Sequence, residues 1–253
     1  MEITTQHPLY RTPILTPFSQ ELGAYHLREG FKLLFNTYPN DQTLACLFAQ
    51  TALETGRFKK IQNNNFGNIK KLFSSLDQNL FTMFATGENL WDSKLNKTVY
   101  KWFEPPHIQT CFRHYEDPSE GAADYLALLG KRKRYLPAWN QALAGNAEQF
   151  SRELSKAVYY TADVEIHTKT LVSIYKEVLK KDFFNKIKDI KIEKESLTAD
   201  IIDEEFIMNL VGVNNINSID EMFKRNISDS MDEALEKEIL ELKPRKASWW
   251  KIF

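Results

Sequence analysis

Helical periodicity over the first 180 residues constrains the fold of this chain more than any other feature. Apolar residues recur at three- and four-residue spacing over 22–35, and again after Asn40 and Asp41, which offer an N-cap. The second of these segments ends at Gly56, a common residue just past a helix end. Further helices are predicted from Asp117 onward and over 137–144, 147–157 and 163–181. The sequence therefore predicts a mainly α-helical domain.

One stretch departs from the helical pattern. Residues 80–115 are rich in Phe, Thr, Val, Tyr and Trp, and are broken by the polar segment 92–96 and by the pair Pro105 and Pro106. Aromatic and β-branched residues favour strands, and polar breaks favour turns. We expect a small β-hairpin inserted in the helical domain, which makes the fold class mainly α with an α+β character.

Composition excludes several classes of protein. The 253 residues carry 33 Lys+Arg and 34 Asp+Glu, a balance that argues against a nucleic-acid-binding protein. Cys46 and Cys111 are the two cysteines, and neither they nor the five histidines show metal-ligand spacing, so no metal and no cofactor are expected. The N-terminus lacks a secretory pattern and no run is apolar enough for a membrane span, so we expect synthesis in the cytoplasm without a signal peptide.

The charge balance changes along the chain. Residues 1–180 hold 21 basic and 18 acidic residues, whereas 181–253 hold 12 and 16. We therefore expect an N-terminal arm at 1–19, a catalytic-type domain at 20–181 and a helical C-terminal extension at 182–253. The extension ends in an apolar cluster, Trp249 to Phe253, which would either dock to a protein partner or fold back on its own domain.

Glu54 is the first residue with a chemical interpretation. It follows the apolar run of the second helix and directly precedes the residues that end it, in the sequence Ala-Leu-Glu-Thr-Gly. The negative end of the helix dipole and apolar neighbours favour a protonated carboxyl, which can act as a general acid in glycoside cleavage. The alternative is a solvent-exposed glutamate in a last helical turn.

The segment from Asn63 to Lys70 is a polar loop in which three consecutive asparagines precede Phe66 and Gly67. Such residues accept left-handed backbone conformations, and their amides can line a groove that binds sugar hydroxyls.

Together these motifs resemble the glucosaminidase group of the lysozyme-like superfamily, glycoside hydrolase family 73, which cuts peptidoglycan glycan strands. The resemblance covers about residues 20–180. It continues through a hairpin ending in Phe-Arg-His-Tyr at 112–115, an acidic helix start at 119–126, and a final element at 158–162. Arg57 and Val158 depart from the family pattern, Val158 because glycine is usual there.

The resemblance implies roles for particular residues. Glu54 is expected to be the catalytic general acid, and Tyr159 to face it, with Tyr160 beside it in the groove. A second carboxylate is expected from the hairpin, with Glu88 the best match. Asp92 and Glu104 remain alternatives, as does attack by the substrate's own acetamido group.

The remaining candidates would bind substrate. The resemblance implies groove positions for Asn64, Asn65, Phe66 and Lys70. Stacking on sugar faces is conceivable for three tryptophans, although packing in the core is the better expectation for each: Trp91, Trp102 and Trp139.

The sequence thus predicts a peptidoglycan hydrolase, specifically an endo-β-N-acetylglucosaminidase. The alternatives are a muramidase or lytic transglycosylase of the same superfamily, and a non-catalytic wall-binding or structural component. A wall-acting enzyme without a signal peptide suggests delivery by a bacteriophage or phage-tail-like particle. In that case residues 182–253 would attach the enzyme to a tail or baseplate protein.

Overall fold

The computed structural model describes residues 3–73, 78–92, 95–160, 162–180, 182–188 and 190. The chain divides into two compact units. The first comprises Met1–Glu88 with Lys101–Ile190, and the second comprises Asn89–Tyr100 with Lys191–Phe253. The first unit holds the helices and is described below by itself, since most of the second lies outside the described residues.

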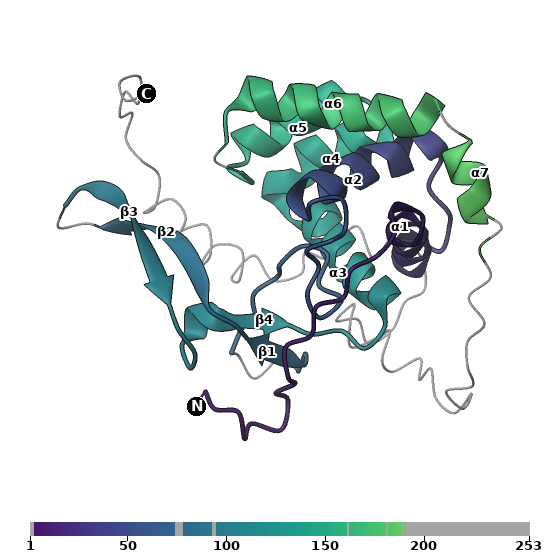
Figure 1. Cartoon of the computed structure of the whole chain (residues 1–253). Coiled ribbons are helices and arrows are strands. Elements are labelled where there is room, and N and C mark those ends of the chain that lie inside the picture. Colours follow the sequence, from purple (N-terminus) through teal and green to yellow (C-terminus); the bar gives the residue numbers. More distant parts are fainter. Residues whose placement is uncertain are drawn as a thin grey trace, which may run out of the picture. The chain divides into compact units, whose positions relative to one another are not determined.

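Helices dominate the first unit, as the periodicity predicts, and the mainly α fold class is confirmed (Figure 1). Short 3₁₀ turns at Ile108–Thr110 and Lys133–Tyr135 accompany them. The α-helices are α1 Gln20–Phe35, α2 Asp41–Glu54, α3 Pro118–Lys131, α4 Leu136–Leu143, α5 Ala147–Lys156, α6 Val164–Lys180 and α7 Phe183–Lys188.

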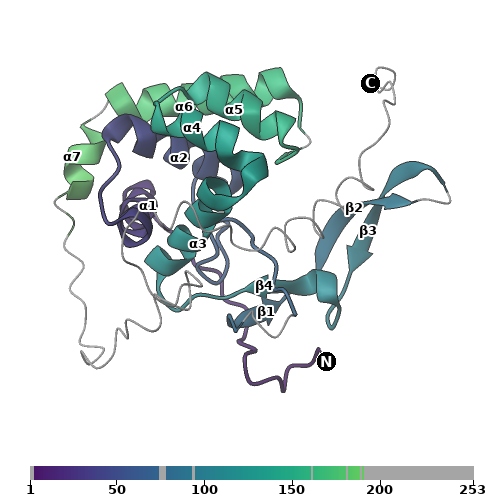
Figure 2. The same ribbon diagram turned by 180° about the vertical axis from the view of Figure 1, so that it is seen from behind.

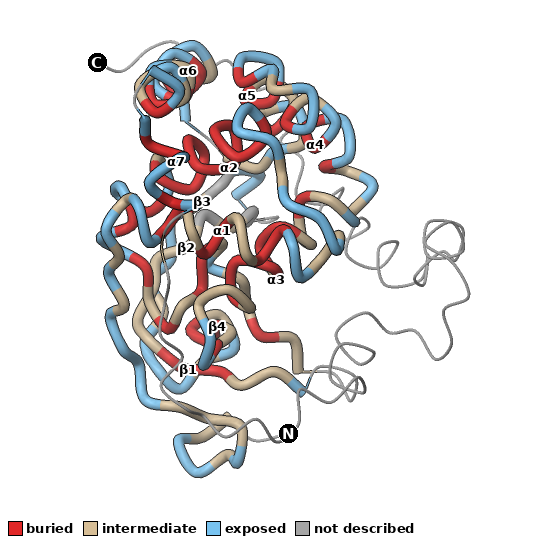
Figure 3. The backbone as a smooth tube through the Cα atoms, turned by 90° about the vertical axis from the view of Figure 1, so that its right-hand side faces the viewer, coloured by how far each residue is buried: buried red, intermediate tan, exposed pale blue. Residues whose placement is uncertain are grey.

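Helix α2 is the central element of this unit. Its N-cap forms as predicted, with the Asn40 side chain accepting a hydrogen bond from the Thr43 backbone N–H at 2.8 Å. Every residue from Thr43 to Ala52 is buried. Buried residues are drawn red in Figure 3. Helices α1, α4, α5 and α6 all contact it. A helix buried on all sides is positioned by packing, so the place where it ends is fixed by its neighbours.

Helices α1 and α3 pack closely enough for their backbones to touch. A Cβ atom added at Gly30 would lie 2.7 Å from the Ala123 backbone nitrogen and 2.9 Å from the Ser119 carbonyl oxygen. Glycine is therefore required at this crossing, because any side chain would push the helices apart. The reverse view shows α3 and α4 from the other side (Figure 2).

Strands occupy the predicted stretch, but as two pairs. The hairpin is formed by β2 Thr86–Asp92 and β3 Lys97–Phe103. It is enclosed in sequence by a second antiparallel pair, β1 Phe81–Met83 and β4 Cys111–Arg113, in which Thr82 pairs with Phe112. The N-terminal arm joins this pair through a parallel bridge between Tyr10 and Phe81.

Helix α7 extends the compact unit past the boundary expected at 181. Phe183 and Phe184 are 8% and 5% exposed and Ile187 is fully buried, all within the main core. The helices expected after residue 200 and the terminal apolar cluster lie outside the described residues. Within the described part of the chain, no helix is both long enough and apolar enough to cross a bilayer.

The turn between α5 and α6 contains a strained residue. Val158 has φ +55°, in the left-handed region, and its backbone N–H donates to the Ser155 carbonyl oxygen at 2.9 Å. The next N–H, of Tyr159, donates to the Leu154 carbonyl at 2.9 Å, which closes the end of α5. Glycine is usual at this position in the family that the sequence resembles. A β-branched residue is costly there because its side chain disfavours the left-handed conformation.

We predict that Val158→Gly raises the free energy of unfolding by about 0.5–1 kcal/mol. Left-handed strain of roughly 1–2 kcal/mol is relieved, and part of this gain is offset by the greater freedom of glycine in the unfolded chain. Little burial is lost, because Val158 is 53% exposed. Denaturant unfolding measures the change. Ala157→Gly is the matched control, since Ala157 has an ordinary φ of −76° and its replacement should lower stability. An unchanged or lower stability of Val158→Gly would contradict the strain.

Candidate active site

Glu54 stands where α2 leaves the core. The helix is buried up to Ala52, and the side chain of Glu54 is 39% exposed. Immediately afterwards the chain turns sharply, with Gly56, Arg57 and Phe58 all at positive φ between +57° and +66°. The Phe58 N–H donates to the Thr55 hydroxyl at 3.0 Å, which helps to fix this turn. The carboxyl is therefore held at the helix end, reachable from solvent.

Two buried side chains approach the same oxygen of Glu54. Gln50, one helical turn earlier and fully buried, donates from Nε2 to Glu54 Oε1 at 2.9 Å. His167 of α6 places its Nε2 atom 3.6 Å from that same Oε1. Among the described residues, no hydrogen bond reaches His167 Nε2, which is buried. No sequence motif marks His167 as a site residue, because it is a single histidine in an amphipathic helix.

A buried polar cluster holds His167 from behind. The Ser151 hydroxyl lies 3.1 Å from His167 Nδ1, 2.9 Å from Thr168 Oγ1 and 3.1 Å from the Tyr160 hydroxyl. Tyr160 also donates to the Ser151 carbonyl oxygen at 2.9 Å, and its ring stacks on His167 with centroids 3.6 Å apart. Tyr160 is thus part of the support of the site, and its contact with substrate stays a prediction.

Tyr159 is electrostatically linked to the catalytic candidate. Its ring is partly buried and packs edge-on against Tyr135 with centroids 5.6 Å apart. Burial raises the pKa of Tyr159 well above the ordinary value, and the nearby Tyr125 hydroxyl and Glu54 carboxyl raise it further. The phenol therefore keeps its proton and can donate a hydrogen bond. A catalytic role for Tyr159 stays a prediction.

The asparagine loop is held together by its own amides. Asn65 is 2% exposed, and its side chain donates to the carbonyls of Ile69 and Arg113 and accepts from the Ile69 N–H. Asn64 donates to the Tyr115 carbonyl at 2.9 Å. Through these hydrogen bonds the side chains of Asn64 and Asn65 satisfy backbone groups and stabilise the conformation of the loop. Sugar binding by these two amides stays a prediction.

Phe66 and Lys70 lie in different surroundings. Phe66 is 1% exposed in the main core and stacks on Phe18, a position that leaves almost none of its ring accessible to a sugar. Lys70 is partly exposed and donates to Glu88 Oε1 at 2.7 Å. Burial lowers the pKa of Lys70, and the Glu88 partner opposes that shift. The structure therefore joins two predicted site residues in one ion pair.

The structure also places Glu104, an alternative second carboxylate, and two of the three tryptophans considered for sugar stacking. Glu104 is exposed and accepts a hydrogen bond from Trp102 Nε1, and the Trp102 ring is 57% exposed. Trp139 is 5% exposed and stacks on Phe31 and Phe35, so it packs in the core as expected. The side chains of Asp92 and Trp91 lie outside the described residues. The described ranges contain no group of His, Cys, Asp and Glu able to hold a metal ion.

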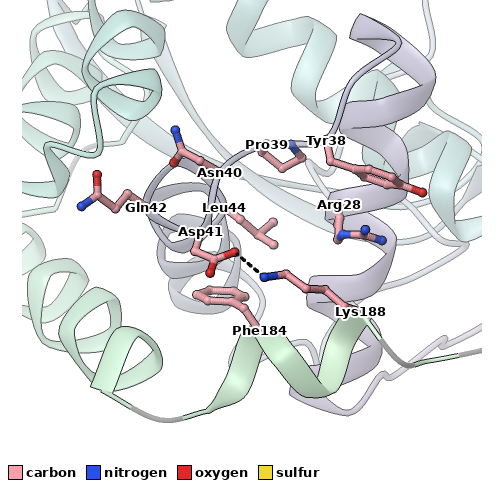
Figure 4. A pocket seen from close by; sticks show the side chains of 9 residues that line it. All are labelled: Arg28, Tyr38, Pro39, Asn40, Asp41, Gln42, Leu44, Phe184 and Lys188. Carbon is pink, nitrogen blue, oxygen red and sulfur yellow. Dashed lines mark ion pairs between the residues drawn. The ribbon is translucent and has the colours of Figure 1, made fainter.

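A pocket among the described residues lies away from Glu54 (Figure 4). It has a volume of about 550 Å³ and opens at the N-terminal end of α2, the end opposite Glu54. Arg28, Asp41, Phe184 and Lys188 are among its lining residues, and Lys188 pairs with Asp41 at 3.4 Å. This pocket is therefore no guide to the site of proton transfer.

Comparison with known proteins gives one family match and one structural match. The glucosaminidase family model, described as mannosyl-glycoprotein endo-beta-N-acetylglucosaminidase, matches residues 40–194. The glycoside hydrolase domain of Salmonella typhimurium FlgJ is 19% identical, with a TM-score of 0.42, covering 68% of this chain and all of that domain. No curated protein matches the sequence. The family match includes α2 with Glu54, the asparagine loop and α6 with His167. The chain belongs to the glucosaminidase family and is a glycoside hydrolase.

Proposed function

We propose that this protein is an endo-β-N-acetylglucosaminidase that cleaves the glycan strands of peptidoglycan, with Glu54 as the general acid. The placement of Glu54 carries the proposal: its carboxyl is reachable at the end of a helix that is otherwise buried. A general acid must contact both a solvent-borne substrate and a rigid support, and this position provides both.

The two oxygens of Glu54 are not equivalent. Oε1 accepts the Gln50 hydrogen bond, whereas no hydrogen bond within the described part of the chain reaches Oε2. Oε2 is thus the oxygen from which a proton would pass to the leaving glycosidic oxygen as its bond to the anomeric carbon breaks. Tyr159, which keeps its phenolic proton, would stabilise the charge that develops on the substrate side.

Glu88 is less well placed than Glu54 for a direct part in catalysis. Glu88 forms an ion pair with Lys70 at 2.7 Å. The Lys70 ammonium also lies 3.8 Å from the centre of the Phe112 ring. A carboxylate neutralised by an ion pair is a poor nucleophile and base. We infer that Glu88 contributes to the electrostatics and to the placement of substrate or water, and that the acetamido group of the substrate attacks the anomeric carbon.

Attachment to a phage or phage-tail-like particle stays part of the proposal. The extension that would bind the particle begins, in the described residues, with α7, whose apolar side chains are buried in the core. Any docking segment therefore has to start after this helix.

Glu54→Gln should lower the rate of peptidoglycan cleavage by about 10²–10⁴-fold, because the amide cannot supply the proton. Gln keeps the shape and the acceptor for Gln50, so stability should change little. Loss of turbidity of purified peptidoglycan measures the rate. Glu148→Gln, at an exposed carboxyl of α5, serves as the control and should retain full activity. Full wall-clearing by Glu54→Gln would refute the assignment and favour a non-catalytic module.

Glu88→Gln should have a much smaller effect than Glu54→Gln, about tenfold or less, since Glu88 is already ion-paired and performs no covalent step. The same turbidity assay compares the two variants directly. A loss equal to that of Glu54→Gln would show that Glu88 is an essential second carboxylate and that the substrate-assisted route is wrong.

The digestion products should carry new N-acetylglucosamine reducing ends. Reduction of the digest with borohydride, followed by hydrolysis and sugar analysis, identifies the new ends. New N-acetylmuramic acid ends would identify a muramidase, and anhydro products would identify a lytic transglycosylase; either result would contradict the glucosaminidase assignment.

A further inference from the structure

We propose that Gln50 is a positioning residue for Glu54, which determines which of the two carboxyl oxygens carries the catalytic proton. The inference rests on the proposed role of Glu54 as general acid. It assigns Oε1 to the hydrogen bond from Gln50, and Oε2 to the proton that passes to the glycosidic oxygen. Gln50 therefore contributes to the rate of bond cleavage although it is buried and does not touch the substrate.

The backbone that carries Glu54 is fixed by hydrogen bonds at the end of α2. The Thr55 hydroxyl donates to the Thr51 carbonyl oxygen at 2.6 Å, and the Thr55 N–H donates to the same oxygen at 2.9 Å. The Arg57 N–H donates to the Ala52 carbonyl oxygen at 2.6 Å. These bonds hold the main chain of Glu54, but they leave its side chain able to rotate. A general acid needs its carboxyl in one orientation, so a further contact is required.

Gln50 supplies that contact. Its Nε2 donates to Glu54 Oε1 at 2.9 Å, across the one helical turn that separates the two residues. Gln50 is 0% exposed, so its amide cannot turn outward to water. His167 Nε2 lies 3.6 Å from the same oxygen, which is beyond hydrogen-bond distance. The hydrogen bond that orients the carboxyl at Oε1 therefore comes from Gln50.

The direction of this hydrogen bond favours one position of the proton. A protonated carboxyl has one oxygen that carries hydrogen and a carbonyl oxygen that is the better acceptor. Because Gln50 presents an N–H to Oε1, the favoured form has its carbonyl oxygen at Oε1 and its proton on Oε2. No hydrogen bond within the described part of the chain reaches Oε2. The proton is thus carried by the oxygen that is left for the substrate.

The same hydrogen bond stabilises the carboxylate that proton transfer produces. The Oε2–H bond breaks and its hydrogen bonds to the glycosidic oxygen, which keeps the electron pair of its broken bond to the anomeric carbon. The acetamido oxygen of the substrate supplies the pair that the anomeric carbon loses. Glu54 is left with a negative charge shared by both oxygens, and the Gln50 N–H already lies at Oε1. A charged acceptor is bound more strongly than a neutral one, so the barrier is lowered.

Stability gives no reason for an amide at this position. Gln50 Oε1 is buried and has no hydrogen-bond partner among the described residues. A buried polar atom without a partner costs free energy, whereas an apolar side chain of similar size would fill the same space without that cost. The preceding residues of α2, from Leu44 to Ala49, are all apolar and buried. A residue that weakens the core and binds the catalytic carboxyl is better explained by activity than by folding.

Gln50→Met tests the proposal. Methionine has a similar length and volume, and it removes both the N–H donor and the carbonyl that has no partner. With soluble peptidoglycan fragments, kcat should fall about 10–100-fold, the range expected when one donor to a developing charge is lost. KM should not change, because the lost interaction strengthens only in the transition state. The midpoint of denaturant unfolding should stay the same or rise.

Two results for Gln50→Met would overturn the proposal. The first is a wild-type kcat, which would show that the carboxyl needs no hydrogen bond at Oε1. The second is a fall in kcat with a matching loss of stability, which would make Gln50 a structural residue.

Thr43 provides a matched control, because it is a buried polar residue of the same helix. It is 2% exposed, and its hydroxyl donates to the Leu143 carbonyl oxygen at 3.1 Å. Thr43→Val keeps the shape but removes this donor, so it should lower stability and leave kcat unchanged. The two variants should therefore differ in opposite ways. A loss of kcat in Thr43→Val equal to that in Gln50→Met would overturn the proposal, since any polar change in α2 would then lower activity.

Gln50→Asn covers the case in which Gln50→Met fails to fold. Asparagine keeps the amide, but its side chain is one methylene shorter and its N–H no longer reaches Oε1. The expected loss of kcat is the same, and a wild-type kcat would refute the proposal. In the Glu54→Gln background, neither change should cause a further loss, because Gln50 acts through the carboxyl. Full activity of Glu54→Gln alone would instead refute the proposed function, so the two failures are distinguishable.

Discussion

The burial of α2 is the constraint on which the rest of the structure depends. Ten consecutive residues, Thr43 to Ala52, are buried among α1, α4, α5 and α6, so the helix cannot slide or rotate without breaking contacts on every side. Its last residue is therefore placed as precisely as the core itself. The asparagine loop follows the end of this helix in sequence, and α6, which packs against α2, places His167 3.6 Å from Glu54.

Much of this fold could be predicted from the sequence because its determinants are local. Apolar spacing and caps locate α2 within one or two residues, and Gly56 takes the left-handed conformation expected past its end. The hairpin follows from strand propensity. The enclosing β1–β4 pair does not, because its three-residue strands are specified by partners about thirty positions apart in sequence, which no short window contains.

The site was less predictable for a physical reason. Composition suggests that the amides of Asn64 and Asn65 are free to bind sugar, but backbone groups brought in from Arg113 and Tyr115 use them. Likewise Lys70 and Glu88 were selected independently, and only the folded chain pairs them. His167 was overlooked because its meaning depends on a distance to another helix. Each of these outcomes is a tertiary contact, which periodicity and propensity do not encode.

Several buried polar side chains in this core gather near Glu54, and their burial is not explained by their contribution to stability. Residues Leu44 to Ala49 of α2 are buried and apolar, whereas Gln50, Ser151, His167 and Thr168 are buried polar residues, and Gln50 and His167 lie close to Glu54 at the end of the helix. Burying such groups costs free energy unless they are well bonded, and apolar residues of similar size would stabilise the fold at least as well. Packing alone thus gives no reason for their presence. Gln50 Nε2 and His167 Nε2 lie 2.9 Å and 3.6 Å from one oxygen of Glu54, so these polar groups surround the carboxyl that we propose as the general acid.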